Sequence, residues 1–401
     1  MFKPLAHPSM LLSVLLAGPC LAADNSFNPA ISLILDGRYT AYANDSEYTL
    51  PGFLLGGEAG REEEGFHLGH NELAISADVD DSFYGKLTTV IADHEGSTEV
   101  ELEEAYVETL ALGQGLTIRA GRFYSGIGYL NEQHPHAWDF ADAPLIYRGL
   151  FGDQLRDDGV RLSWVAPTDL YIRLGTEIGR GENFPAGGAK NGGAGAWTLY
   201  AKFGGDIGDS NAWQLGISHW QADIEDRTSG DHNHDGAASE IPTYSGESRV
   251  NGIDFVWKWA PRGNPTERNF KFQAEYFTRD ENGTLVMDDG SIDPETTSYD
   301  GRQAGWYAQG VYQFRPHWRV GLRYDRLSSN NRGSDPTVLA EAGLDEAGHT
   351  PSRSTLMFDY SHSEYSRLRA QYSQDDSYAD ADDILTLQYI MSLGPHGAHQ
   401  F

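Results

Sequence analysis

The sequence predicts an all-β protein, a transmembrane antiparallel β-barrel of about sixteen strands with long external loops. The 401 residues include 46 glycines, 21 tyrosines, 17 phenylalanines and 9 tryptophans. After the N-terminus, no apolar run approaches the roughly 20 residues that a membrane helix needs. Residues 384–393 alternate, with Leu385, Leu387 and Tyr389 on one face and Thr386 and Gln388 on the other. Because backbone polar groups in lipid must be paired, a sheet that spans a membrane has to close on itself.

The C-terminus supports the same fold. The last residue, Phe401, keeps the parity of the apolar face that begins at Leu385. A final strand that is apolar outside, polar inside and ended by an aromatic residue is typical of bacterial outer-membrane barrels. We interpret Phe401 as an assembly signal. The expected location is the outer membrane of a Gram-negative bacterium, with outer-membrane lipid and the barrel-assembly machinery as partners.

Residues 1–23 have the pattern of an export signal, which leaves 24–401 as the barrel. Lys3 supplies the positive charge, residues 10–17 form the short apolar core, and cleavage is expected after Ala22 or Ala23. Cys20 is the only cysteine, and the Pro19 before it disfavours lipid attachment, which requires a small residue there. A mature chain without cysteine needs no disulfide framework, which fits passage through an oxidising periplasm.

Alternation with period two predicts where the strands begin. The sixteen predicted strands start near Ala30, Gly65, Phe83, Val100, Leu116, Asp158, Leu170, Ala196, Asn211, Arg249, Arg268, Gln303, Trp318, Arg353, Ser366 and Asp382. The fourth strand, over residues 99–110, alternates only if a β-bulge lies near Glu103 and Glu104, as often happens in barrels.

Connection lengths alternate between short and long, which predicts the topology. The short connections are 80–81, 112–115, 166–169, 207–210, 315–317 and 363–364, and the long ones are 44–64, 125–157, 225–248, 280–302 and 330–352. Short periplasmic turns and long external loops produce this alternation and put both ends of the chain in the periplasm. The first strand begins almost at the cleavage site, so we expect no separate N-terminal plug and a lumen narrowed by the protein's own loops.

The longest connection, the third external loop, is rich in aromatic and apolar residues for a loop that faces solvent. In sixteen-stranded porins the third loop folds into the barrel, and we expect the same here rather than the alternative, a cap over the rim. The predicted constriction residues are Tyr129, Glu132, His134, His136, Trp138 and Asp139.

Two segments resemble a known family. Residues 121–140 (GRFYSGIGYLNEQHPHAWDF) and 393–401 (LGPHGAHQF) resemble outer-membrane proteins labelled zinc-regulated TonB-dependent receptor-like proteins. The barrel is also similar to the phosphate-selective porin superfamily, in which a Gly-Arg-Phe strand precedes the constriction loop. The resemblance spans the mature chain and implies expression under zinc limitation and a role in zinc uptake. The receptor label fits poorly with a chain that lacks a plug, and a porin-like shape fits better.

Paired histidines point to zinc independently, because imidazole is its usual ligand and nearby carboxylates can complete the site. His134 and His136 would project to one side of an extended segment, with Glu132 and Asp139 close enough to complete a loose site. Other candidates are His232 and His234 with Asp231 and Asp235, His67 with His70, and His396 with His399. We predict transient zinc binding with no required cofactor. The alternatives are that the first pair packs within the loop and that 231–235 is a solvated tip.

The charge pattern excludes one class of partner and leaves ion selectivity open. A net charge of −30 argues against nucleic acid, since phosphate binding needs a basic surface. Acidic residues are concentrated in loops, which favours cations, whereas a basic wall would favour anions. The predicted lumen-lining residues are mixed in sign: Arg119, Arg161, Arg173, Glu177, Lys202, Arg323 and Arg369.

Together these patterns predict a porin-like channel for small solutes or ions, linked to zinc acquisition. The alternative from another class is a surface metal-binding, receptor or adhesion barrel with a closed pore. An enzyme is not expected, because the sequence has no Gly-x-Ser-x-Gly elbow or matching triad order. Three barrels could associate as a homotrimer, as many porins do.

Overall fold

The computed structural model describes residues 29–44, 50–56, 59–94, 97–188, 192–229, 241–288, 294–346, 348–377 and 381–394. Its strands are β1 (Ala30–Tyr42), β2 (Gly65–Leu68), β3 (Asn71–Asp78), β4 (Phe83–His94), β5 (Ser97–Thr109), β6 (Leu116–Tyr124), β7 (Arg156–Val165), β8 (Tyr171–Gly179), β9 (Ala196–Ile207), β10 (Asn211–Thr228), β11 (Ile241–Trp259), β12 (Asn269–Asp288), β13 (Glu295–Arg315), β14 (Trp318–Gly333), β15 (Ser352–Ser363), β16 (Ser366–Asp376) and β17 (Asp382–Leu393).

The connections contain α1 (Leu145–Phe151), α2 (Pro336–Glu341) and the 3-10 turns η1 (Pro135–Ala137) and η2 (Pro261–Gly263). In the described part of the chain, no helix is long and apolar enough to cross a membrane. The predicted signal peptide, Phe401, the 231–235 segment and the His396 and His399 pair lie outside the described residues.

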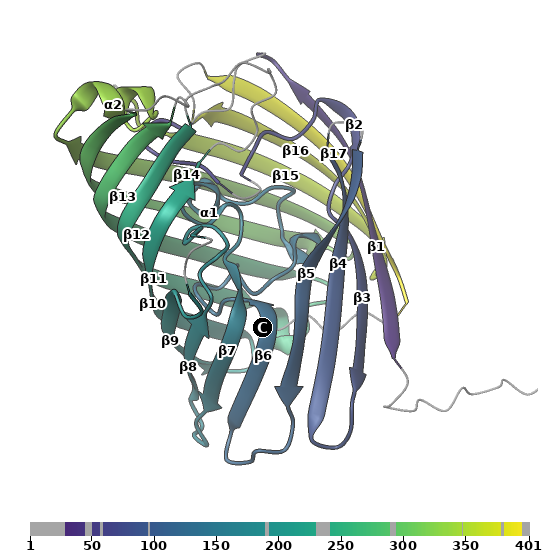
Figure 1. The fold of residues 1–401 in the computed structure, drawn as a ribbon. Helices are drawn as coiled ribbons and strands as arrows, with labels where there is room; N and C mark the ends of the chain where they lie inside the picture. The colour runs from purple at the N-terminus through teal and green to yellow at the C-terminus, as the bar shows by residue number, and fades with distance from the viewer. Residues whose placement is uncertain are drawn as a thin grey trace, which may run out of the picture.

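The strands form one closed antiparallel barrel (Figure 1). From β3 onward each strand pairs with the next, and β17 pairs with β1 from Leu33↔Leu393 to Tyr42↔Ile384, which closes the sheet. β2 and β3 both pair with β1 and are two segments of one wall strand, so the seventeen labelled segments make sixteen strands. The predicted strand number and antiparallel barrel are confirmed.

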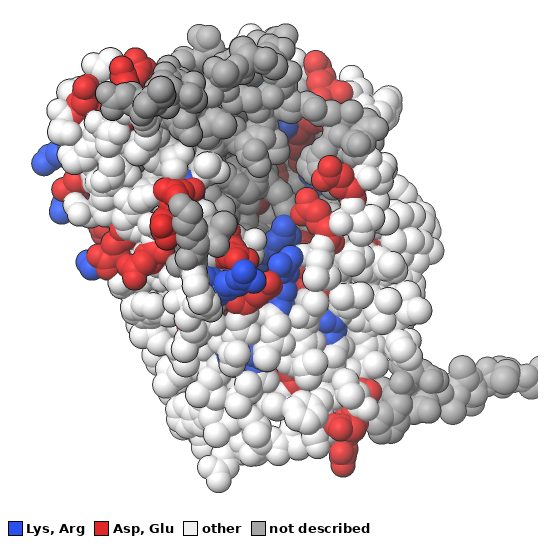
Figure 2. Space-filling model, in the orientation of Figure 1, with Lys and Arg blue, Asp and Glu red and all other residues white. Residues whose placement is uncertain are grey.

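The wall is apolar outside and polar inside, as the alternation predicts. On β17, Leu385 and Leu387 are 42% and 44% exposed, whereas Thr386 and Gln388 are 6% and 2% exposed. Figure 2 shows the result on one face, where the lower wall is largely free of charged residues. The apolar outer surface of such a wall is removed from water only when lipid surrounds the barrel.

Two strand boundaries differ clearly from the prediction. β11 begins at Ile241 rather than Arg249, and β13 at Glu295 rather than Gln303. Ladder pairing with β10 and β12 continues as far as Thr228↔Thr243 and Met287↔Glu295. These extensions lack outward apolar alternation. They are held by backbone pairing and by inward side chains such as Tyr244 and Tyr299, whose rings lie edge-on with centroids 5.6 Å apart. The corresponding loops are therefore shorter than predicted.

The predicted bulge in the fourth wall strand is present. The register between β4 and β5 shifts from Thr88↔Glu104 to Thr89↔Leu102, which leaves Glu103 as the extra residue. A bulge lets two neighbouring side chains share one face of a strand. Glu103 and Glu104 are both buried.

The break between β2 and β3 places a second group of polar residues in the lumen. A Cβ on Gly69 would lie 2.3 Å from Arg38 Nε and 2.5 Å from an Asp36 oxygen, so a larger residue would displace this ion pair. Asn71 accepts a hydrogen bond from the Asp36 N–H at 2.9 Å, which holds the strand that follows the break. His70 lies at this break, with its ring in contact with Glu72 and Glu103.

The upper half of the lumen contains a hydrophobic core. Side chains of the first loop (Leu50, Phe53, Leu54), of the third loop and of the inner wall form one buried cluster that includes Trp220, Phe277 and Tyr307. The inside of a simple aqueous barrel is polar. Here loop segments fill that space and give the barrel an interior like that of a globular protein.

Candidate functional site

The candidate site is the constriction loop, residues 125–155 between β6 and β7, together with the wall around it. β6 and β7 pair up to Tyr124↔Arg156. Immediately beyond, the Ser125 N–H donates to the Leu155 carbonyl at 2.9 Å. The buried Asn131 amide donates to both the Ser125 and Leu155 carbonyls at 2.8 Å. The loop thus leaves the wall through a narrow, fully hydrogen-bonded neck.

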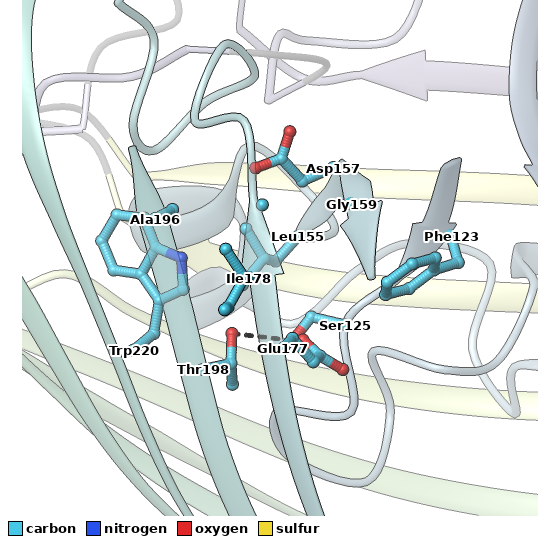
Figure 3. Close-up of a pocket in the computed structure, with 11 residues that line it drawn as sticks. Phe123, Ser125, Leu155, Asp157, Gly159, Glu177, Ile178, Ala196, Thr198 and Trp220 are labelled. Atoms are coloured by element: carbon cyan, nitrogen blue, oxygen red, sulfur yellow. Dashed lines mark hydrogen bonds between the residues drawn. The ribbon is translucent and has the colours of Figure 1, made fainter. Parts of the chain in front are cut away.

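The neck packs tightly on the neighbouring strands β8 to β10 (Figure 3). The cavity there is about 20 Å³, enough for about one water molecule. Glu177 of β8 accepts hydrogen bonds from the Ser125 hydroxyl at 2.5 Å and the Gly126 N–H at 2.8 Å. Glu177, a predicted lumen-lining residue, therefore binds the first residues of the constriction loop.

The loop carries α1, which lies inside the barrel (Figure 1). All seven residues of α1 are buried, and Gly152 ends the helix with φ of +62°. The Leu145 N–H donates to Asp325 of β14 at 3.0 Å. The Tyr147 and Phe151 rings lie edge-on to Phe277 of β12, with centroids 5.6 and 5.2 Å away. The loop therefore reaches the opposite wall, which confirms the predicted inward fold and rules out a rim cap.

A single carboxylate on that opposite wall binds the loop at several points. Glu275 of β12 accepts hydrogen bonds from the N–H groups of Tyr129 and Leu130, each at 3.0 Å. It also accepts from the hydroxyl groups of Tyr147 at 2.8 Å and Tyr307 at 2.5 Å. Gly128, with φ of +63°, passes so close that a Cβ would lie 2.4 Å from Glu275. The loop is shaped to fit this carboxylate.

Three acidic residues of the loop, Glu132, Asp139 and Asp142, are paired with cations of the wall. Glu132 contacts Arg161 and Lys202 at 2.8 Å and Arg173 at 3.2 Å. Asp139 contacts Arg319 at 2.8 Å and Lys271 at 3.1 Å. Asp142 contacts Arg353 at 2.7 Å and Arg323 at 2.8 Å. These pairs connect the loop to strands from β7 to β15.

The charges of these cations decide the ionisation of the three carboxyl groups. Burial opposes the charge of Glu132, but Arg173, Lys202 and Arg161 outweigh it and hold its pKa well below the ordinary value. Burial likewise opposes ionisation of Asp139 and Asp142. Wall cations, led by Lys271 for Asp139 and Arg323 for Asp142, hold both pKa values below the ordinary range. The loop is therefore docked in its fully ionised form.

The remaining predicted residues lie at different depths. Trp138 is buried, and its carbonyl accepts from Arg369 at 2.9 Å. The Tyr129 ring lies 5.0 Å from the Lys271 ammonium. Arg119 pairs with Glu108 at 2.7 Å and lies over the Tyr106 ring, close to the short turn between β5 and β6. Arg119 thus lines the lumen but does not hold the constriction.

His134 and His136 face a different part of the wall, where the carboxylates of β3 and β5 gather. His134 Nδ1 lies 3.1 Å from oxygens of both Glu72 and Glu103, and its Nε2 lies 2.9 Å from Glu104. His136 Nδ1 lies 2.7 Å from Glu72. Burial opposes charge on His134, but Glu72, Glu103 and Glu104 raise its pKa well above 6.5. The acidic wall here complements the basic wall that binds the rest of the loop.

The predicted partners of the two histidines are wrong. Glu132 and Asp139 are bound by cations of the wall, and neither forms a described contact with His134 or His136. The segment around Pro135 is also the 3-10 turn η1 rather than extended, although the two rings still lie together, 5.8 Å apart and nearly parallel. Sequence neighbours were displaced here by wall residues that are distant in the chain.

Sequence reasoning missed several of these residues. Glu72, Glu104 and Asp142 are not among the predicted site residues. The sequence pairs His70 with His67, whereas the His70 ring contacts Glu72 and Glu103, which His134 also contacts. One signal was available for Glu72. Leu73 and Ile75 have the parity of an outward apolar face, so the adjacent Glu72, which has the other parity, is expected to face inward. Nothing local in the sequence indicates which loop residue it meets.

Below the loop the lumen is open. A cavity of about 610 Å³ lies among the short turns and is lined by Asp139, Lys258, Lys271 and Arg319 among others. The constriction loop forms its roof through Asp139. The lumen therefore has a filled outer half and a wide, charged inner vestibule.

The ionised loop predicts a pH window for the constriction. A carboxyl group whose pKa is lower in the docked loop stabilises docking above its ordinary pKa, 3.8 for Asp and 4.5 for Glu. That stabilisation is lost as the pH falls below those values. Single-channel conductance should stay constant between about pH 7 and pH 5 and rise below about pH 4. A rise already between pH 7 and 5 would contradict this assignment.

The closed barrel with an inserted loop defines the class, an outer-membrane porin-like β-barrel. The chain is similar to the outer membrane channel DcaP of Acinetobacter baumannii (13% identity, TM-score 0.54, covering 91% of this chain and 96% of that one). It is also similar to the anion-selective porin from Comamonas acidovorans (10%, 0.54, 91% and 99%) and to a loop L8 deletion mutant of OmpT, an outer membrane protein of Vibrio cholerae (11%, 0.55, 92% and 100%). Identities this low show the fold alone. DcaP and OmpT are both outer-membrane proteins of Gram-negative bacteria, and the apolar outer wall of the present barrel fits the same environment.

No protein-family model matches the chain. An uncharacterised protein of Aquifex aeolicus (strain VF5) is 30% identical over 408 residues, which cover 94% of this chain and 81% of that protein. The chain belongs to the same family as the Aquifex protein.

Proposed function

We propose that the protein is a porin-like channel that passes small solutes or ions across the outer membrane through a lumen narrowed by the constriction loop. The observation that carries this proposal is the loop itself, which meets the wall on both sides above an open vestibule of about 610 Å³. A loop bound by side-chain contacts sets the width and charge of the narrowest point. Porin and channel neighbours of the same fold support this reading.

We also propose a link to zinc acquisition. Its support is the sequence resemblance together with the histidine and carboxylate side chains at the constriction. A homotrimer is a further proposal, supported by a trimer form of the Vibrio OmpT with the same fold. Outer-membrane lipid and the barrel-assembly machinery are the remaining proposed partners, and no catalytic role is proposed.

One observation favours the alternative, a surface metal-binding or receptor barrel with a closed pore. The buried apolar cluster in the upper lumen takes up space that water would occupy in an open channel. A resting state that is closed, opened by movement of the constriction loop, would reconcile both readings.

Planar-bilayer recording of the purified barrel tests the proposal. A channel should give discrete open steps, and reversal potentials in a salt gradient should give its ion preference. A barrel that inserts but stays silent at all voltages would favour the closed-pore alternative.

A further inference from the structure

We propose that His70, Glu72, Glu103, His134 and His136 form a binding site for a divalent transition-metal ion of the Zn²⁺ type, at the contact between the constriction loop and the wall. The inference deepens the proposed link to zinc and rests on the loop being docked as described. Zinc binding and ion conductance are separate measurements, so the metal site and the channel can be refuted independently.

The nitrogen and oxygen atoms converge as metal ligands do. Three imidazole Nδ1 atoms surround the Glu72 carboxylate, at 3.1 Å for His70, 3.1 Å for His134 and 2.7 Å for His136. Tetrahedral ligands at about 2.0–2.1 Å from zinc lie about 3.3 Å from one another. The three nitrogen–oxygen distances are therefore close to the spacing between neighbouring ligands of a zinc ion.

Glu103 joins the same group from the bulge of β5. Its oxygens lie 2.8 Å from His70 Nε2 and 3.1 Å from His134 Nδ1. One ligand atom from each of His70, Glu72 and Glu103 can be chosen so that all lie within 4.8 Å of one another. The wall alone therefore offers three ligands, and His134 and His136 of the loop lie beside them, each in contact with Glu72.

The charge of the cluster calls for a cation. Glu72, Glu103 and Glu104 are buried, and the Lys86 ammonium pairs with Glu104 at 2.6 Å. The next cation, Arg38, is already paired with Asp36 and Glu62. Three carboxylates and one ammonium leave two negative charges, which protonated imidazole such as that of His134 balances while no ion is bound. Buried charge is costly unless it is compensated in this way. A divalent ion would supply that compensation, displacing protons from the histidines.

Ligand chemistry and access narrow the class of ion. Imidazole with carboxylate suits zinc and its neighbours in the first transition row, whereas calcium and magnesium take oxygen ligands. The carboxylates are at most 3% exposed, but the His70, His134 and His136 side chains are 14%, 14% and 15% exposed. An ion arriving through the lumen would thus meet imidazole first.

Metal binding would add a coordinate link between the loop and the wall to the hydrogen bonds and ion pairs that already join them. His70, Glu72 and Glu103 belong to the wall, and His134 and His136 to the loop. An ion bound between them should hold the loop against β3 and β5. Zinc should therefore lower the current that monovalent ions carry through the lumen.

The decisive experiment is a calorimetric titration of chelator-treated, purified barrel with zinc chloride. Wild type should bind one equivalent at the cluster. His134→Ala/His136→Ala and, separately, Glu72→Gln should weaken that binding at least about 100-fold, since each removes ligands or the charge at the centre. His362→Ala removes an exposed histidine on β15 and should bind as wild type does. Heat-modifiable electrophoretic mobility would establish that each variant is a folded barrel.

Wild type that binds no zinc, or a folded double variant that binds as tightly as wild type, would overturn the site. In bilayers, micromolar zinc should reduce the current of wild type and His362→Ala but not of the double variant. A barrel that conducts without binding zinc would refute the site and leave the channel standing. A barrel that binds zinc but does not conduct would support the metal site and refute the channel.

Discussion

Replacing residues 126–154 by a short glycine-serine turn should give a folded barrel with several-fold higher single-channel conductance. β6 and β7 remain in register up to Tyr124↔Arg156, so a tight turn can join them without disturbing the wall. The excised segment contains α1 and the three loop carboxylates, Glu132, Asp139 and Asp142, that pair with cations of the wall. A sixteen-stranded barrel without such a segment encloses an aqueous channel. Planar-bilayer recording at fixed salt measures the change.

A smaller excision of residues 131–140 provides a graded comparison. It removes Glu132, His134, His136 and Asp139 but leaves α1, so its conductance should lie between wild type and the full excision. Equal conductance in all three folded proteins would place the narrowest point elsewhere, for example at the first loop.

Glu275→Ala should release the constriction loop from the opposite wall. Four donors, the N–H groups of Tyr129 and Leu130 and the hydroxyls of Tyr147 and Tyr307, lose their charged acceptor inside the barrel. Buried donors left without an acceptor cost about 1–3 kcal/mol each, and we expect loop docking to weaken by about 3–5 kcal/mol in total. Limited trypsin digestion reports the release, because Arg148 of α1 is buried in the docked loop.

Glu247→Ala is the matched control. Glu247 also lies on a neighbouring strand of the barrel, but its pair with Arg249 is largely exposed and contributes about 0–1 kcal/mol. Trypsin should cut after Arg148 in Glu275→Ala and leave it intact in Glu247→Ala and wild type. Protection of Arg148 in both variants would show that the other ion pairs hold the loop without Glu275.

Local sequence pattern was enough to predict the wall. Outward apolar alternation on residues such as Leu385 and Leu387 is imposed by lipid on every strand, so period two reveals it. The bulge at Glu103 was predictable for the same reason, since one extra residue restores a broken alternation. The strand extensions at Ile241 and Glu295 were missed because the constraint from lipid ends where the membrane ends.

The composition of the loop predicted its insertion but not its contacts. Aromatic and apolar residues in a nominally external loop must be buried somewhere, and the lumen is the nearest place. Which carboxylate meets His134, by contrast, depends on the stagger of the barrel and on the break at Gly69. Both of these depend on pairings among strands remote in sequence. Proximity along the chain favoured Glu132 and Asp139 as partners of the two histidines. In the folded barrel both carboxylates instead pair with arginines of distant strands.

The distribution of the loop's anchors constrains the order in which this molecule can fold. Ala141 is bound by Gln371, 230 residues later, and Leu145 by Asp325, 180 residues later. Glu72 and Glu103 precede the loop, and Arg353 and Arg369 follow it almost at the end of the chain. While the sheet is still open these partners stand on separate strands, and ordering the loop would cost entropy without compensation. Docking of the loop is thus a late event that requires β17 to have met β1, and a docked loop marks a barrel that has closed in the correct register.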